Sequence, residues 1–266
     1  MAQRTIVTLT TDFGYRDPFV GIMKGVLLGS NPDLCLVDIS HGIPPQDVFA
    51  GALAIKAAVP FFPAGTIHLG VVDPGVGSER RALIIEAGDF YFVGPDNGLF
   101  SLALKDSEPQ RIFELNNDVY HRKPTSTTFH GRDIFAPAAA QVSLGTSPQK
   151  LGSPSDAFVE LPWPAVRQNR RLLRGEVVYL DGFGNASTNI WEEHLLPFSR
   201  HALTISVGRR KIRGLSESYA AVGEGTFVAV LNSWRCLEIA VRNGSAKEKG
   251  KISVGTQVTV TLPKDS

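Results

Sequence analysis

The sequence is poor in cysteine, in net charge and in long apolar runs. Its only cysteines, Cys35 and Cys236, provide neither a disulfide framework nor a CxxC metal signature, so we expect two buried free thiols in a reducing compartment. The formal net charge of +1 gives no electrostatic argument for a nucleic-acid or anionic-membrane partner. No apolar run approaches the roughly 18 residues that span a membrane. Because residues 1–4 lead straight into a predicted strand, we expect no signal peptide and a cytoplasmic protein.

Three familiar enzyme signatures are also missing. The segment Gly75-Val76-Gly77 does not continue as GxGxxG, so a dinucleotide-binding fold is unsupported. No GxSxG motif is present to form the nucleophile elbow of a serine hydrolase. Neither HxxEH nor clustered histidine spacing occurs, which leaves a metal site as a less favoured alternative. Such a site would draw on Asp12, Asp73, Asp96, Asp133 and His130.

The first half of the chain alternates predicted strands with predicted helices. Strands are expected at 5–10, 34–38 and 66–72, and helices at 19–28, 47–59 and 136–144. Asp17 and Asp133 are the expected N-caps of the first and last of these helices. Residues 82–93 read as a hairpin around a Gly-Asp turn. This alternation predicts an α/β domain, residues 1–152, with a mostly parallel sheet and helices on its faces.

The pattern changes after a proline-rich stretch without periodicity, residues 153–170, which we interpret as a linker. Residues 171–266 contain short apolar runs between Gly and Asn turns, at 175–180, 202–207, 226–230, 237–241 and 256–261. These runs predict an all-β C-terminal domain, a small barrel or a sandwich.

Four acids, Asp12, Asp38, Asp73 and Asp96, stand at the ends of predicted strands. The carboxyl ends of parallel strands share one edge of a sheet, where ligands collect. Each acid by itself could bind ribose hydroxyls, bind a metal or simply form a turn. Four of them at one edge indicate a binding site.

A water-activating group is the chemical hypothesis for that edge. Asp73 ends an apolar run and precedes a Pro-Gly turn, Arg80 follows seven residues later, and His130 lies in a Ser/Thr-rich loop before a glycine. Asp73 would accept a hydrogen bond from one water molecule, Arg80 would hold charge, and His130 would titrate near neutrality.

Two loops in the second half offer binding side chains. In Asp181-Gly182-Phe183-Gly184-Asn185, Phe183 could stack on a flat ring and Asn185 could pair with a base edge. A glycine turn with one core aromatic residue explains the same residues equally well. In the loop at 232–235, Trp234 could line a site or an interface.

Six ordered motifs resemble those of the S-adenosylmethionine hydroxide adenosyltransferases, relatives of fluorinating and chlorinating enzymes. They are TDFG (11–14), VDPGVG (72–77), GPDNG (94–98), FHGRD (129–133), DGFGN (181–185) and LEIAV (237–241). The resemblance implies an α/β domain followed by a β-barrel. It also implies a homotrimer whose active sites lie between one subunit's N-terminal domain and its neighbour's C-terminal domain.

The resemblance also implies roles for individual residues. Asp73, Arg80 and His130 would form the catalytic triad that activates water or hydroxide, and Asp12 would hold the ribose hydroxyls. The remaining substrate-binding residues would be Phe183 and Asn185 at the adenine, Asp181 and Ser233 at the methionine end, and Glu238 and Val241 from the LEIAV match. Halogenating relatives carry a tyrosine in place of Asp73 and tend to have an arginine where Trp234 stands, with Arg235 adjacent here.

The expected reaction is hydrolysis of S-adenosyl-L-methionine to adenosine and L-methionine, by attack of activated water or hydroxide at ribose C5′. The resemblance implies this small molecule as substrate, with no metal or redox cofactor. A halide-dependent adenosyltransferase and a non-catalytic binder of S-adenosylmethionine or adenosine are the alternatives.

Overall fold

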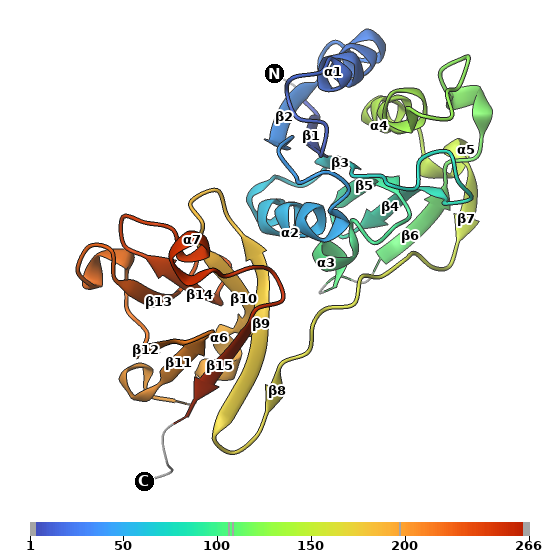
Figure 1. Ribbon diagram of the computed structural model, residues 1–266. Helices are drawn as coiled ribbons and strands as arrows, with labels where there is room; N and C mark the ends of the chain where they lie inside the picture. The colour runs from blue at the N-terminus through green and yellow to red at the C-terminus, as the bar shows by residue number, and fades with distance from the viewer. Residues whose placement is uncertain (1–3, 106, 108, 197, 263–266) are drawn as a thin grey trace. The chain divides into compact units, whose positions relative to one another are not determined.

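The computed structural model describes residues 4–105, 107, 109–196 and 198–262, and it divides into two compact units (Figure 1). The first unit ends at Leu161 and the second begins at Pro162. Within the described residues, no helix combines the length and the apolar character needed to cross a membrane.

A seven-stranded mixed sheet forms the centre of the first unit, in the order β2-β1-β3-β5-β4-β6-β7. The strands are β1 (Ile6–Thr11), β2 (Cys35–Ser40), β3 (Ile67–Val71), β4 (Ala82–Ala87), β5 (Phe90–Pro95), β6 (Pro109–Glu114) and β7 (Ser153–Ser155). Strands β2, β1, β3 and β5 pair in parallel, and β4, β6 and β7 continue the sheet antiparallel. The predicted fold class is therefore confirmed, with the parallel strands gathered in one half of the sheet.

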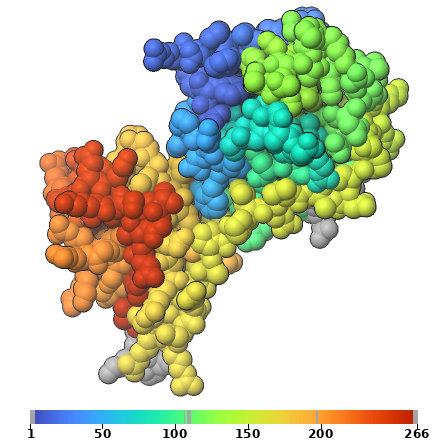
Figure 2. Space-filling view, turned by 45° about the vertical axis from the view of Figure 1, so that its right-hand side comes forward, coloured from blue at the N-terminus to red at the C-terminus, as the bar shows by residue number. Residues whose placement is uncertain are grey.

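Helices cover both faces of this sheet. They are α1 (Phe19–Ser30), α2 (Val48–Ala58), α3 (Ser101–Leu104), α4 (Ala136–Ser143) and α5 (Pro148–Leu151), with 3₁₀ turns at Val59–Phe61 and Asp118–Tyr120. Helices α1 and α4 lie side by side, as Figures 1 and 2 both show. Val7 and Leu9 of β1 pack in one core cluster with residues of these two helices. Gly70 of β3 approaches Ile55 of α2 and the segment just before α3.

Several local expectations were wrong. Helix α1 begins at Phe19 as expected and ends two residues later than expected, but Pro18 takes the N-cap position and Asp17 does not cap the helix. Asp133 does not cap a helix, because it lies inside a π-helical turn, Gly131–Phe135, that runs directly into α4. Cys236 is buried as expected, but Cys35 is exposed because it begins β2, the edge strand of the sheet.

The second unit is an antiparallel, nearly closed barrel. Its strands are β8 (Arg167–Gln168), β9 (Leu172–Leu180), β10 (Ala186–Trp191), β11 (Thr204–Val207), β12 (Arg210–Arg213), β13 (Phe227–Leu231), β14 (Cys236–Val241) and β15 (Gln257–Thr261). Two short helices, α6 (Glu192–Leu195) and α7 (Ala246–Gly250), and 3₁₀ turns at Arg200–Ala202 and Tyr219–Ala221 complete it. The order is β12-β11-β15-β9-β10-β14-β13, with β8 added to β9, and β12 lies near β13. This confirms the predicted β-barrel.

Three strands were not expected from the sequence, namely β6, β10 and β12. Strand β10 reads Ala-Ser-Thr-Asn-Ile-Trp, and its polar residues are buried with hydrogen-bond partners, so its sequence shows no apolar alternation. Two further short strands, β7 and β8, lie in the segment 153–170 that we interpreted as a linker. Pro154 is tolerated in β7 because this strand forms the edge of the sheet.

Close packing at Gly94 in β5 gives a prediction about stability. A Cβ on Gly94 would lie 2.3 Å from the carbonyl oxygen of Gly70 and 2.9 Å from the Phe100 ring. Replacing Gly94 with alanine should therefore lower the free energy of unfolding by about 1–3 kcal/mol. The control is Gly25→Ala in α1, where a Cβ meets nothing within 4 Å, and where alanine should stabilise by up to about 1 kcal/mol. Urea unfolding of both variants tests this, and equal shifts would contradict the packing argument.

Candidate active site

The four strand-end acids lie at one edge of the first sheet. Asp12 follows β1, Asp73 lies two residues after β3 and Asp96 follows β5, while Asp38 lies near the end of β2. These four strands are parallel neighbours, so their carboxyl ends meet as expected. The edge is therefore acidic, and the partners of each carboxylate decide its role.

Two of these acids have structural partners. Arg81 donates to Asp96 from Nε at 2.9 Å and from Nη2 at 2.6 Å, and the Val159 N–H donates to the same carboxylate at 2.7 Å. Asp38 accepts from Lys24 at 2.7 Å. Burial raises the pKa of Asp38, but hydrogen bonds from Lys24 and His41 bring that pKa below its ordinary value.

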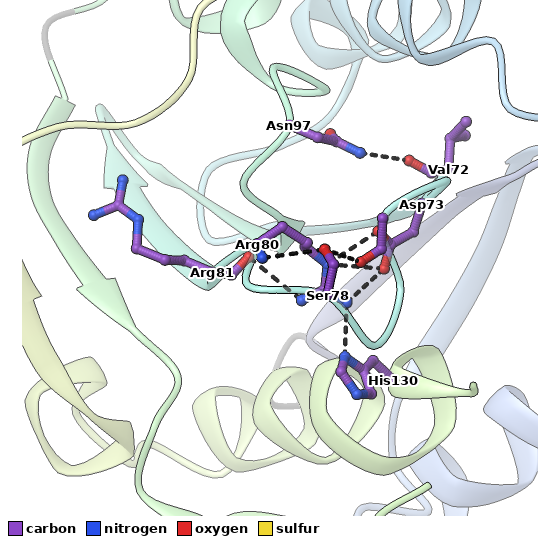
Figure 3. Close-up of polar contacts among 8 residues, drawn as sticks. Val72, Asp73, Ser78, Arg80, Arg81, Asn97 and His130 are labelled. Atoms are coloured by element: carbon purple, nitrogen blue, oxygen red, sulfur yellow. Dashed lines mark hydrogen bonds and ion pairs between the residues drawn. The ribbon is translucent and has the colours of Figure 1, made fainter. Parts of the chain in front are cut away.

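Asp73, Arg80 and His130 form one hydrogen-bonded group (Figure 3). The Arg80 Nε lies 3.0 and 3.1 Å from the two carboxylate oxygens of Asp73, and Arg80 Nη2 lies 2.5 Å from Oδ2. The same Nη2 lies 2.7 Å from His130 Nδ1. The side chains of Arg80 and Asp73 are 9% and 5% exposed, so this ion pair is shielded from solvent. The three residues predicted to act together are thus in contact.

Glycines allow the two loops that carry this group to touch. Gly77 has a φ of +78°, and a Cβ there would lie 2.4 Å from the backbone oxygen of Thr127, three residues before His130. The loop after Asp73 is closed by a hydrogen bond from the Val76 N–H to the Asp73 carbonyl at 3.2 Å. The Arg80 guanidinium also packs over the Phe135 ring at 5.2 Å, which adds a cation–π contact.

The contact with Arg80 determines the protonation of His130. A guanidinium has only donors, so Nδ1 of His130 must accept, and the neutral ring carries its proton on Nε2. Burial lowers the pKa of His130, the charge of Arg80 lowers it further, and Asp73 and Asp133 offset part of this effect. The surroundings of His130 therefore hold its pKa below the ordinary value and favour the neutral ring.

Asp133 anchors the loop that leads to His130, a role that the sequence did not reveal. Its side chain is fully buried and accepts from the Ser126 N–H at 2.8 Å and from Arg132 Nε and Nη2, each at 2.7 Å. These bonds keep the pKa of Asp133 below its ordinary value even though burial raises it. The signal available in the sequence was the pairing of Arg132 with Asp133 directly after His130 and Gly131.

Asp12 and an aromatic cluster are further features of the first unit. Asp12 accepts from the Gln46 N–H at 2.8 Å, and Gln46 adopts a φ of +65°. The rings of Phe13, Phe19 and Phe129 pack with centroid distances between 5.3 and 5.9 Å. Phe129 directly precedes His130, so this ring cluster is linked through the backbone to the triad histidine.

The second unit has a pocket of about 420 Å³ that contains three of the predicted substrate-binding residues, Asp181, Ser233 and Glu238. The other three do not line it. Phe183 is 81% exposed on the adjoining turn, and Asn185 donates to Asp181 Oδ2 at 3.0 Å. Val241 lies in the barrel core, because side chains alternate along β14 and only Glu238 faces the pocket.

Metal ligation has little support in the geometry. Within the described part of the chain, no group of three or more His, Cys, Asp or Glu side chains is arranged to hold a metal ion. Among the residues considered as ligands, Asp73, Asp96 and Asp133 each pair with an arginine.

Comparisons with known proteins match nearly the whole chain to one protein family. Residues 7–152 match the model of the SAM hydroxide adenosyltransferase N-terminal domain, and residues 175–259 match that of its C-terminal domain. A Thermus thermophilus protein named (R)-S-adenosyl-L-methionine hydrolase is 39% identical over 95% of this chain and 98% of its own. A Salinispora tropica protein of the same name is 37% identical over 98% and 99%.

More distant relatives and solved structures extend the comparison. A Nocardia brasiliensis fluorinase is 26% identical over 299 aligned positions, which cover 98% of each chain. The crystal structure of an uncharacterized conserved protein from Thermotoga maritima superimposes with a TM-score of 0.89 at 32% identity, covering 96% of this chain and 99% of that one.

The protonation of His130 can be measured. In ¹H–¹⁵N spectra His130 should show the Nε2–H tautomer and a pKa below the ordinary 6.5. Arg80→Met should raise that pKa, because it removes a neighbouring positive charge and leaves Asp73 beside the ring. The matched control is Arg81→Met, which removes the ion pair with Asp96 but does not contact His130. An Nδ1–H tautomer, or equal titration in the two variants, would contradict this assignment.

Proposed function

The chain belongs to the SAM hydroxide adenosyltransferase family, and on that premise we propose that it hydrolyses S-adenosyl-L-methionine to adenosine and L-methionine. The contact group of Asp73, Arg80 and His130 at the carboxyl edge of parallel strands is the observation that carries this proposal. Relatives named (R)-S-adenosyl-L-methionine hydrolase, at 35–39% identity, support it.

The step of this reaction that most needs catalysis is the activation of the nucleophile. Attack at ribose C5′ of a sulfonium expels a neutral thioether, so the leaving group needs no general acid. Water has a pKa of about 15.7, so its oxygen must be oriented and its proton accepted as the new bond forms. Holding the oxygen, C5′ and sulfur in line, with reacting atoms about 3–3.5 Å apart, contributes further to the rate.

In the proposed mechanism each triad residue has one task. A lone pair of the water oxygen forms the C5′–O bond, the C5′–S pair moves to the sulfur of methionine, and one water proton leaves through the Asp73 carboxylate to solvent. Arg80 holds that carboxylate by a bidentate contact and so fixes the position of the proton acceptor. The neutral His130 ring, with its proton on Nε2, donates to the water oxygen and orients it.

The other predicted residues complete the substrate site in this proposal. Asp12 holds the ribose hydroxyls, Phe183 and Asn185 contact the adenine, and Asp181 and Ser233 contact the methionine end. Glu238 supports the methionine end from the pocket wall, and Val241 supports the same strand from the barrel core.

We further propose the setting in which this site works. The protein is a cytoplasmic homotrimer, and each site combines the N-terminal unit of one subunit with the C-terminal unit of its neighbour. The reaction uses S-adenosylmethionine as its substrate and needs no metal or redox cofactor.

Product analysis in ¹⁸O-labelled water tests the reaction. We expect adenosine carrying one ¹⁸O at C5′, together with unlabelled methionine. Added chloride should yield no 5′-chloro-5′-deoxyadenosine. That product would identify a halide-dependent adenosyltransferase, whereas a raised melting temperature without conversion would identify a binder.

The role of Asp73 can be tested against a second strand-end acid. Asp73→Asn should lower kcat by about 100-fold or more, because it removes the proton acceptor and the ion pair with Arg80. Asp38→Asn should change kcat by less than about threefold, because Asp38 pairs with Lys24 and lies outside the triad. Equal kcat values in the two variants would contradict the proposed role of Asp73 as the proton acceptor.

The pH dependence follows from the lowered pKa of His130. Protonation would put a second donor against Arg80 and break the contact at Nδ1, so kcat/KM should fall as pH drops through a pKa below 6.5. Above that pKa the ring is neutral, and its protonation state should impose no loss of rate. A kcat/KM profile from pH 4 to 9 measures this, and an acid limb centred above 6.5 would contradict it.

A further inference from the structure

The pocket of the second unit is rich in negative charge and in aromatic rings. The pocket has a volume of about 420 Å³. Its wall includes the carboxylates of Asp181, Glu217 and Glu238 and the aromatic rings of Tyr179, Tyr219 and Trp234. Among the described lining residues there is no lysine, arginine or histidine, so the wall carries a formal charge of −3. A cavity of this charge favours a cationic ligand.

Glu238 is a buried carboxylate of the pocket whose hydrogen-bond donors carry no positive charge. It is only 5% exposed and accepts from Tyr219 Oη at 2.7 Å, Asn232 Nδ2 at 3.0 Å and Ser187 Oγ at 3.2 Å. All three donors are neutral, and no ion pair of Glu238 exists among the described residues. A buried carboxylate without a counter-charge is costly, and a bound cation would offset that cost.

Neither of the other two acids has a cationic partner among the residues that the structure describes. Asp181 accepts from the N–H groups of Phe183 and Asn185 at 2.9 and 2.8 Å, and from the Asn185 amide. Glu217 is exposed at the pocket wall and forms no hydrogen bond or ion pair within the described chain. Both carboxylates therefore remain available to a positively charged ligand.

Arg235 does not supply the missing positive charge. It stands next to Trp234 in sequence, but its guanidinium pairs with Glu192, outside the pocket wall. The Glu192 N–H also donates to the Arg235 carbonyl at 2.8 Å, which fixes the backbone in this arrangement. A ligand carboxylate in the pocket would thus face acids and aromatic rings.

The aromatic rings add a second kind of cation recognition. Tyr179 and Trp234 lie with centroids 5.4 Å apart and their planes at 49°, and both line the pocket. Ring faces attract ammonium and sulfonium groups through their quadrupoles, most strongly when water is excluded. Carboxylates and rings together match a ligand that carries an ammonium group a few bonds from a sulfonium.

From this wall we infer that the pocket selects the ammonium group of the methionine end and does not require its carboxylate. The protein would then also hydrolyse decarboxylated S-adenosylmethionine, to adenosine and 3-(methylthio)propylamine. This inference rests on the proposed function. The second reaction balances in the same way, because water oxygen bonds to C5′, the C5′–S pair returns to sulfur and one proton is released.

Substrates that differ in one charged group test the inference. We expect kcat/KM for decarboxylated S-adenosylmethionine to lie within about tenfold of that for S-adenosylmethionine. For the analogue that keeps the carboxylate but lacks the amine, kcat/KM should be about 100-fold or more lower than for S-adenosylmethionine, because the pocket carboxylates then remain unpaired. The reverse order of the two analogues would overturn the inference.

Variants of the wall give an independent test. Glu217→Gln should raise KM about tenfold for both amine-bearing substrates and leave kcat nearly unchanged, since it removes charge from the pocket wall without touching a buried network. Glu193→Gln on α6 is the matched control, because Glu193 is exposed and lies outside the pocket wall. A KM in the Glu217 variant equal to that of the control would count against recognition by the acidic wall.

Binding without turnover separates this inference from the proposed function. Calorimetry at pH 7 should show that 3-(methylthio)propylamine binds the full-length protein at least about tenfold more tightly than 4-(methylthio)butanoate. If the amine binds preferentially but no adenosine forms from any substrate, the proposed function fails and the pocket inference stands. If S-adenosylmethionine is hydrolysed but the amine is not preferred, the pocket inference alone fails.

Discussion

The guanidinium of Arg80 joins two segments that lie fifty residues apart, and the candidate site depends on this contact. It donates to both carboxylate oxygens of Asp73 and to one nitrogen of His130, and it packs on Phe135. A planar fork of fixed donors can make these contacts at once, which an ammonium group cannot do. Because the guanidinium only donates, its position fixes the tautomer of the imidazole. Burial lowers the pKa of His130, and the charge of the guanidinium lowers it further.

Close backbone approach makes that contact possible. Gly77 lies against the Thr127 carbonyl, so the loop that bears Arg80 and the loop before His130 pack without side chains between them. Asp133 then ties the second loop to the π-helical turn through the Ser126 N–H. The site is therefore built on loops, but each loop is held by buried hydrogen bonds and by glycines, as preorganised positioning of a nucleophile requires.

Much of this arrangement could be predicted from residue patterns, and the errors have physical causes. The strand-end positions of Asp73 and Asp96 were correct because parallel strands bring their carboxyl ends together. Strand β10 was missed because hydrogen bonds make its buried polar residues tolerable, which removes the apolar alternation. The prediction that Asp133 caps a helix was wrong, because a capping acid and an acid inside a helical turn look alike in sequence. Cys35 lies on an edge strand, and strand order is not visible locally.

The amino-acid sequence by itself determined the two-part α/β and β-barrel organisation, the acidic sheet edge and the candidate triad, because strand periodicity, turn residues and motif order are local properties. Only the tertiary structure decided which acids are taken up by structural partners, as Asp96 is by Arg81, and which nitrogen of His130 carries the proton. It also decided the charge of the pocket beside Glu238, since Arg235 turns to Glu192 instead of the pocket wall. Charge and protonation depend on distances between residues far apart in the chain, and such distances exist only after folding.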